Sequence, residues 1–130
     1  MNKGIFVSGI GTEVGKTVVS AILVEALQAD YWKPVQSGDL DYTDTDKIRA
    51  WTSFDVRTHP ESYRLHTPAS PHASAAIDGV TIRLESFQLP GTDNFLVAEG
   101  AGGLLVPLND RHLIIDLIEY LALPVVLVSR

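Results

Sequence analysis

The residues best suited to chemistry form one glycine-rich segment near the amino terminus. Residues 9–17 read GIGTEVGKT and follow a short apolar run. Glycines in such a loop let successive backbone N–H groups point at an anion, and a following helix adds the positive end of its dipole. Lys16 would neutralise the β and γ phosphates of a nucleotide, and the hydroxyl of Thr17 would ligate Mg²⁺. The segment therefore predicts a phosphate-binding loop.

This loop departs from the eight-residue pattern usual for phosphate-binding loops. Ile10 stands where the first glycine of that pattern is expected, and Gly9 lies one residue too early. Glycine-rich turns between a strand and a helix also occur without a nucleotide, so a purely structural loop is the alternative. Packing or turn formation alone gives little reason for a Gly-Lys-Thr sequence at the start of a helix in an acidic chain. We therefore interpret the segment as a variant nucleotide-binding loop.

Four more side chains are candidates for the same site. Glu99 follows a buried strand at the edge where doubly wound sheets bind ligands, and an unpaired charge there would be costly without a cation. Lys33 ends a second predicted strand, so its ammonium either faces a phosphoryl group or anionic substrate or lies on the surface. Asp46 could hold Mg²⁺ or cap a helix, but the residues alone favour a solvated acidic loop. Ser37 could bind substrate or stabilise a turn.

The elements that must position these residues alternate along the chain. Continuous apolar runs predict strands over 5–8, 94–98 and 124–129, and helical spacing predicts helices over 16–29 and 113–123. A short strand is expected over 30–33, because Pro34 cannot continue a helix. Short helices are expected over 47–51, capped by Thr45 or Asp46, and over 72–77. Residues 35–38 and the rest of 55–79 are expected to be irregular. Continuously apolar strands indicate a parallel sheet covered on both faces, an α/β layer fold in a single domain, 1–130.

Composition excludes several classes of function. The chain has 130 residues, 45% hydrophobic and 20% charged, which is typical of a globular protein. It has no cysteine, which excludes disulfides, zinc–thiolate sites and a cysteine nucleophile. The formal net charge of −6 has the wrong sign for non-specific nucleic-acid binding. No run resembles a signal peptide or a membrane span, so we expect a cytoplasmic protein with neither nucleic-acid nor membrane partners.

Four separated motifs together resemble the dethiobiotin synthetase family. They are GIGTEVGKT at 9–17, KPVQSG at 33–38, SPH at 70–72, and EGAGG at 99–103 followed by Pro107. The motifs occur in the family's order, and the resemblance spans residues 4–129. It implies a three-layer P-loop NTPase fold with a mainly parallel sheet. The family's chain continues well beyond residue 130, so we expect the sheet to lack its C-terminal strands.

The resemblance implies an ATP- and Mg²⁺-dependent ligase of biotin biosynthesis that is a homodimer at full length. The family closes the ureido ring of dethiobiotin from 7,8-diaminopelargonic acid, CO₂ and ATP. One amine captures CO₂ as a carbamate, ATP phosphorylates the carbamate to a carbamic–phosphoric anhydride, and the second amine expels phosphate. The alternatives are a nucleotide-binding fragment without turnover and a related variant-loop ATPase or amidoligase.

Matching this chain to the family's motifs assigns the catalytic and nucleotide-binding roles. Lys33 matches the family's catalytic lysine, and Lys16 would stabilise charge on the transferred phosphoryl group. The residues expected to bind ATP are Glu13, Val14, Gly15, Lys16, Thr17, Val18, Asp46, Glu99, Gly100, Ala101 and Gly102.

The same matching assigns a metal site and a substrate site. Thr17, Asp46 and Glu99 correspond to the oxygen ligands of Mg²⁺, and the match to the family strengthens the case for Asp46. Thr12 and Ser37 would contact the diamine substrate. Many family members carry an aspartate at the place of Gly11, a difference that leaves Lys16 and Thr17 in place.

Overall fold

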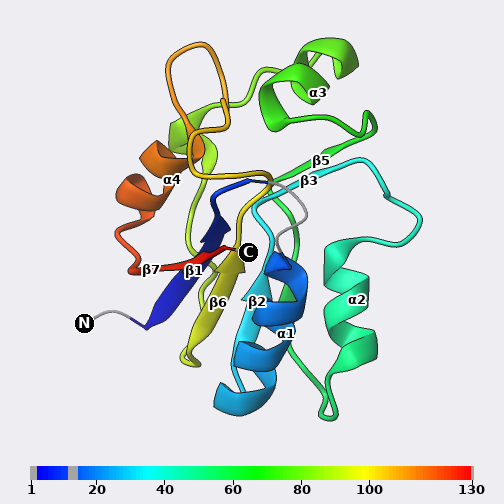
Figure 1. Ribbon diagram of the computed structural model, residues 1–130, viewed down its shortest axis with the longest axis vertical. Helices are drawn as coiled ribbons and strands as arrows, with labels where there is room; N and C mark the ends of the chain where they lie inside the picture. Colours follow the sequence, from blue (N-terminus) through cyan, green and yellow to red (C-terminus); the bar gives the residue numbers. More distant parts are fainter. Residues whose placement is uncertain (1–2, 12–14, 130) are drawn as a thin grey trace.

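A computed structural model describes residues 3–11 and 15–129 of the chain. The described part centres on a five-stranded parallel sheet in the order β4-β2-β6-β1-β7 (Figure 1). A second, two-stranded parallel sheet pairs β3 with β5. The strands are β1 (Gly4–Gly9), β2 (Asp30–Trp32), β3 (Val35–Ser37), β4 (Thr58–His59), β5 (Tyr63–Leu65), β6 (Leu96–Glu99) and β7 (Val125–Val128).

Helices cover both faces of the larger sheet. On one face, α1 and α2 pack against Val7, Tyr31 and Val97, while α3 and α4 belong to the core on the other face, which includes Phe6 and Trp32. Successive strand residues point to opposite faces, so β1, β2 and β6 each contribute to both cores. This arrangement confirms the predicted three-layer α/β fold. The helices are α1 (Lys16–Leu27), α2 (Asp44–Trp51), α3 (Pro71–Asp78), α4 (Ile114–Leu121) and the 3₁₀ turn η1 (Leu84–Ser86).

No helix within residues 3–11 and 15–129 has both the length and the apolar character needed to cross a bilayer.

Three local predictions are wrong. Residues 35–38 were expected to be a loop, but 35–37 form β3, and β4 and β5 lie in the stretch expected to be irregular. These strands have two or three residues, too few to show a periodic pattern, and their pairing depends on partners distant in sequence. Helix α2 begins at Asp44 with Thr43 as its cap, in place of Thr45 or Asp46.

Candidate functional site

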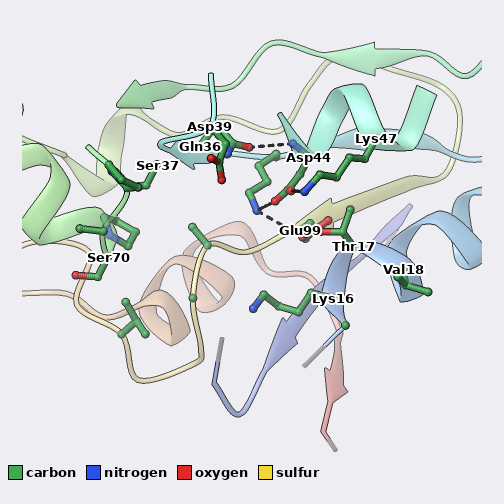
Figure 2. Close-up of a pocket in the computed structure, with 18 residues that line it drawn as sticks. Lys16, Thr17, Val18, Gln36, Ser37, Asp39, Asp44, Lys47, Ser70 and Glu99 are labelled. Carbon is green, nitrogen blue, oxygen red and sulfur yellow. Dashed lines mark hydrogen bonds and ion pairs between the residues drawn. The ribbon is translucent and has the colours of Figure 1, made fainter. Parts of the chain in front are cut away.

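A cavity of about 610 Å³ lies at the carboxyl ends of β1, β2 and β6 (Figure 2). Its wall includes the first turn of α1, the segment from Lys33 to Asp39, the start of α2, the loop before α3 and the loop after β6. These segments meet because the parallel strands end at the same edge of the sheet. The same cavity is therefore lined by Gly15, Lys16 and Thr17 of the predicted glycine loop, by Lys33 and by Glu99.

Lys16 begins α1 at the cavity wall. Gly15 before it has a φ of 95°, a left-handed conformation that glycine adopts readily. Lys16 is 9% exposed, and its Nζ donates a hydrogen bond to the carbonyl oxygen of Gly11 at 3.2 Å. Burial, followed by repulsion from Lys33, lowers the pKa of the Lys16 ammonium. An anion beside both lysines would relieve that repulsion, so this end of the cavity suits phosphate.

Glu99 is the last residue of β6 and is 1% exposed. The Thr17 hydroxyl donates to Glu99 Oε2 at 2.8 Å, and the Tyr31 hydroxyl donates to Oε1 at 2.8 Å. Thr17 and Glu99 meet because β1 and β6 are neighbouring strands, with Val7 in register with Glu99. The buried carboxylate is thus hydrogen-bonded on both oxygens, and one of its partners, Thr17, lines the cavity.

Lys33 lies between two carboxylates. Its Nζ forms ion pairs with Asp44 and with Glu99 Oε2, the latter at 3.4 Å, and it also donates to the carbonyl oxygen of Gly100 at 3.4 Å. Burial by itself disfavours the Lys33 ammonium, but the charges of Glu99 and Asp44 outweigh that effect and raise its pKa. At 5% exposure, Lys33 is a buried cation in the cavity wall, so the alternative of a surface lysine is wrong.

Asp44 is a cavity residue that the sequence analysis did not single out. Burial opposes its ionisation, but the Lys33 ammonium, and then Lys47, lower the pKa of its carboxyl group. Its backbone N–H donates to Gln36 Oε1 at 3.3 Å, and Gln36 Nε2 donates to the carbonyl oxygen of Gly38 at 3.0 Å. Figure 2 shows Gln36, Asp44 and Glu99 around the same space. The Gln36 amide therefore ties the start of α2 to the segment that carries Lys33.

Asp46 occupies a different place from the one predicted for it. Its Oδ2 accepts from the Thr43 backbone N–H at 2.9 Å, its Oδ1 pairs with Arg49 at 3.3 Å, and it does not line the cavity. An α-helix rotates by about 200° over two residues, so the side chains of Asp44 and Asp46 point to opposite sides of α2. The residues Thr43-x-x-Asp46 match a capping box, and that signal could have identified Asp46 as a helix cap. The structure brings Asp44 to the place for which Asp46 was predicted.

The other predicted residues lie at or under the cavity wall where the structure describes them. Ser37, Val18, Ala101 and Gly102 line it. The Ser37 hydroxyl is buried and has no hydrogen-bond partner within the described part of the chain, so it is free to bond to a ligand. Gly100 is buried, and a Cβ on it would lie 2.9 Å from Phe6 Cε1. The predictions for Thr12, Glu13 and Val14 fall outside the described residues.

The oxygen atoms at this wall fit Mg²⁺. Thr17, Asp44 and Glu99 supply one hydroxyl and two carboxylates, which are hard ligands of the kind Mg²⁺ prefers. Within residues 3–11 and 15–129, no three His, Cys, Asp or Glu residues are grouped to hold a metal alone. Mg²⁺ usually completes its shell with water and substrate phosphates, so this donor set suits a cation that arrives with a nucleotide.

Comparison with known proteins agrees with the predicted resemblance. An AAA domain family model matches residues 3–130. The chain is 53% identical over 131 aligned positions to the ATP-dependent dethiobiotin synthetase BioD of Christiangramia forsetii, with 100% of this chain and 63% of that protein covered. It is 51% identical to the proteins of the same name from Brucella ovis and Brucella suis, again with 100% of this chain and 62% of each relative covered.

The chain thus spans 62–63% of the length of these curated relatives. The predicted similarity to dethiobiotin synthetases is confirmed over the whole of the chain. Because the family model covers nearly every residue, including the segment of the glycine loop and the buried Lys33 and Glu99, the chain belongs to the AAA domain family.

Proposed function

We propose that this chain provides the phosphate-binding and catalytic part of an ATP-dependent dethiobiotin synthetase, which carboxylates 7,8-diaminopelargonic acid with CO₂ and closes the ureido ring. The observation that carries the proposal is the buried Lys33 ammonium, held between Asp44 and Glu99 in the same cavity wall as Lys16 and Thr17. The 53% identity to a relative of that name supports the choice of reaction.

ATP is proposed to place its phosphates at the start of α1. Lys16 there provides a positive charge, and the first turn of α1 provides backbone N–H groups and the positive end of the helix dipole. Val18, Ala101 and Gly102 line the same cavity and would contact the nucleotide. The roles of Glu13 and Val14 in holding the phosphates stay predictions from the resemblance.

Mg²⁺ is proposed to bind through the Thr17 hydroxyl, Glu99 Oε2 and the Asp44 carboxylate. When bound, it would neutralise phosphate charge and make the terminal phosphoryl group easier to transfer. Asp44 takes the place that the resemblance gave to Asp46, because Asp46 caps α2 and does not line the cavity.

The proposed chemistry forms one C–N bond, transfers one phosphoryl group and forms a second C–N bond. One amine attacks CO₂ and loses a proton to give a carbamate. A carbamate oxygen takes the γ-phosphoryl group with loss of ADP. The second amine then attacks the carbonyl carbon, expels phosphate and loses a proton. Lys33, whose pKa is raised, stays cationic and stabilises the carbamate and the charge of its phosphorylation. The Ser37 hydroxyl, which has no partner among the residues that the structure describes, would position the diamine together with Thr12.

The test is whether phosphate release from ATP depends on both the diamine and CO₂. We expect purified protein with Mg²⁺ to release phosphate only when 7,8-diaminopelargonic acid and bicarbonate are present, and mass spectrometry to detect dethiobiotin in equal amount. ATP turnover that ignores the diamine but requires DNA or a corrin acid would favour a partition-type ATPase or an amidoligase. Nucleotide binding without any turnover would favour a non-catalytic fragment. The homodimer and the cytoplasmic location stay predictions.

A further inference from the structure

Tyr31 reaches Glu99 from the buried side of the sheet. Tyr31 lies in β2 in register with Val97 of β6, and Glu99 is two residues further along β6. Residues two apart on a strand share a face, so Tyr31, Val97 and Glu99 point to the side covered by α1 and α2. Two strand residues span about 7 Å, which the length of a tyrosine side chain matches. Its hydroxyl accordingly donates to Glu99 Oε1 at 2.8 Å.

The two oxygens of the Glu99 carboxylate have different surroundings. Within the described residues, Tyr31 is the one hydrogen-bond donor to Oε1, whereas Oε2 receives Thr17 at 2.8 Å and Lys33 at 3.4 Å. Thr17 and Lys33 line the cavity, and Tyr31 does not. Tyr31 therefore holds the oxygen that lies away from the cavity and leaves the other oxygen facing it.

The Tyr31 hydroxyl can act here only as a donor. Tyr31 is fully buried, and its hydroxyl is hydrogen-bonded to a carboxylate oxygen, which accepts and does not donate. The proton therefore stays on the phenol oxygen and is directed at the carboxylate. If Glu99 rotated away, a buried hydroxyl and a buried carboxylate oxygen would both lose their partner, and such unpaired groups are strongly disfavoured.

We propose that Tyr31 is a positioning residue for the cation that accompanies the nucleotide. By holding Glu99 Oε1, it fixes the plane of the carboxylate and presents Oε2, beside Thr17, to a divalent cation on the nucleotide phosphates. Mutation of a residue that hydrogen-bonds to a metal ligand, without touching the metal, typically lowers metal affinity by about 10–100-fold. The inference rests on the proposed function, which supplies the Mg²⁺ and the ATP.

The test is the Mg²⁺ requirement for nucleotide binding in a Tyr31→Phe variant, which removes the hydroxyl and keeps the ring. Calorimetry with AMP-PNP, a non-hydrolysable ATP analogue, would be run over a series of Mg²⁺ concentrations and in EDTA. We expect half-maximal enhancement of binding to need about 10-fold more Mg²⁺ than in the wild type. Affinity in EDTA should stay within about two-fold, because Lys16 and the start of α1 are untouched.

Tyr63→Phe is the matched control. It removes a hydroxyl that is hydrogen-bonded to Ser86 Oγ at 2.7 Å and accepts from the Arg83 backbone N–H at 3.1 Å, and Tyr63 does not line the cavity. Loss of these bonds is expected to lower the thermal midpoint and to leave the Mg²⁺ requirement unchanged. A purely structural Tyr31 would behave in the same way, so the Mg²⁺ requirement separates the two roles.

A double-mutant cycle with Glu99→Gln shows whether Tyr31 acts through Glu99. We expect Tyr31→Phe to have no further effect on the Mg²⁺ requirement in a Glu99→Gln background. A wild-type Mg²⁺ requirement in Tyr31→Phe would overturn the inference and leave the proposed function standing. Nucleotide binding that ignores Mg²⁺ in the wild type would overturn both, since Glu99 would then have no cation to receive.

Discussion

Asp30 and Glu99 are buried carboxylates at opposite ends of the same two neighbouring strands. Asp30 begins β2, in register with Leu96 at the start of β6, and Glu99 ends β6. They are 3% and 1% exposed, so burial does not distinguish them. Asp30 accepts hydrogen bonds from Thr92 and Asn94 at 2.8 and 3.0 Å, and His59 Nε2 lies 2.8 Å from it.

The partners of each carboxylate differ in what else they can do. Those of Asp30 join β4 and the chain before β6 to the start of β2, which braces the sheet. Two partners of Glu99, Thr17 and Lys33, line the cavity and can turn toward a ligand. A buried acid is therefore a poor guide to function by itself. Asp30 and its partner Asn94 also line a cavity, but the start of α1 does not contribute to it, whereas the partners of Glu99 share their cavity with Lys16. That shared cavity makes Glu99 a candidate for chemistry and leaves Asp30 a structural role.

The largest effect we expect is on turnover in Lys33→Ala. Loss of the cation that faces the developing charge should lower kcat by about 10²–10³-fold, the range found when one such stabilising group is removed. Nucleotide affinity should change little, because Lys16 remains. Steady-state phosphate release and calorimetry would measure the two quantities. Arg64→Ala removes a cation that pairs with Glu61 at 3.1 Å outside the cavity, and it should leave kcat unchanged.

An unchanged kcat in Lys33→Ala would remove Lys33 from the mechanism. It would also place Glu99 with Asp30 as a carboxylate whose partners serve the fold.

Asp30→Ala is expected to lower stability and to leave turnover unchanged. It leaves three neighbouring donors without their acceptor, so the free energy of unfolding should fall by about 2–4 kcal/mol. Urea denaturation would measure this loss, and kcat measured at a temperature where the variant stays folded should match the wild type. Asp93→Ala, a change at an exposed carboxylate close by, should alter stability by less than about 0.5 kcal/mol. A large loss of kcat in the folded Asp30→Ala variant would contradict the structural role.

Asp44→Ala and Asp46→Ala form a matched pair within one helix. Asp44→Ala should raise the Mg²⁺ concentration for half-maximal activity by about 10-fold, because it removes a proposed ligand from the cavity wall. Asp46→Ala should leave that concentration unchanged and lower the free energy of unfolding by about 1 kcal/mol through loss of the capping box. The reverse pattern would show that Asp46 serves the metal, as the resemblance alone implied.

The smallest effect concerns acid stability. Burial opposes ionisation of Asp30, but the hydrogen bonds from Asn94, His59 and Thr92 outweigh it and lower the Asp30 pKa. A carboxyl group with a lowered pKa stabilises the fold above its unfolded pKa of about 3.9, and that contribution is lost as pH falls through the folded value. The stability difference between wild type and Asp30→Ala should therefore narrow below about pH 4. Urea titrations from pH 5 to pH 3 would show it, and a constant difference would contradict it.

The layered fold and much of the site could be predicted from local patterns. Continuous apolar runs identified β1, β6 and β7, and Pro34 indicated the strand before it, β2. Parallel strands place their carboxyl ends together, which brought Lys16, Lys33 and Glu99 to one edge. The helix over 72–77 was also predicted, and the structure has α3 over Pro71–Asp78.

The rest depends on contacts that no short window of sequence contains. Strand β3 has three residues and exists through its pairing with β5, 28 positions along the chain, as Val35 pairs with Tyr63. In the sequence, Tyr31 is indistinguishable from any other residue of a buried strand. Only its register with Val97, set by the pairing of β2 with β6, places its hydroxyl beside Glu99. The difference between Asp44 and Asp46 arises from where α2 begins, and the acidic loop before the helix obscured that boundary.

Lys33 and Pro34 are the whole connection between β2 and β3, which belong to different sheets, since β2 ends at Trp32 and β3 begins at Val35. Two residues of extended chain span only about 7 Å, so this connection has no slack. The Pro34 end of this connection is also held in place, because the backbone N–H groups of Ser62 and Tyr63 donate to the carbonyl oxygen of Pro34 at 2.9 and 3.1 Å. Lys33 therefore lies in a short, anchored junction between the two sheets. Only three residues separate Lys33 from Ser37 at the end of β3, so a displacement of β3 by a ligand bound to Ser37 would also displace the backbone of Lys33.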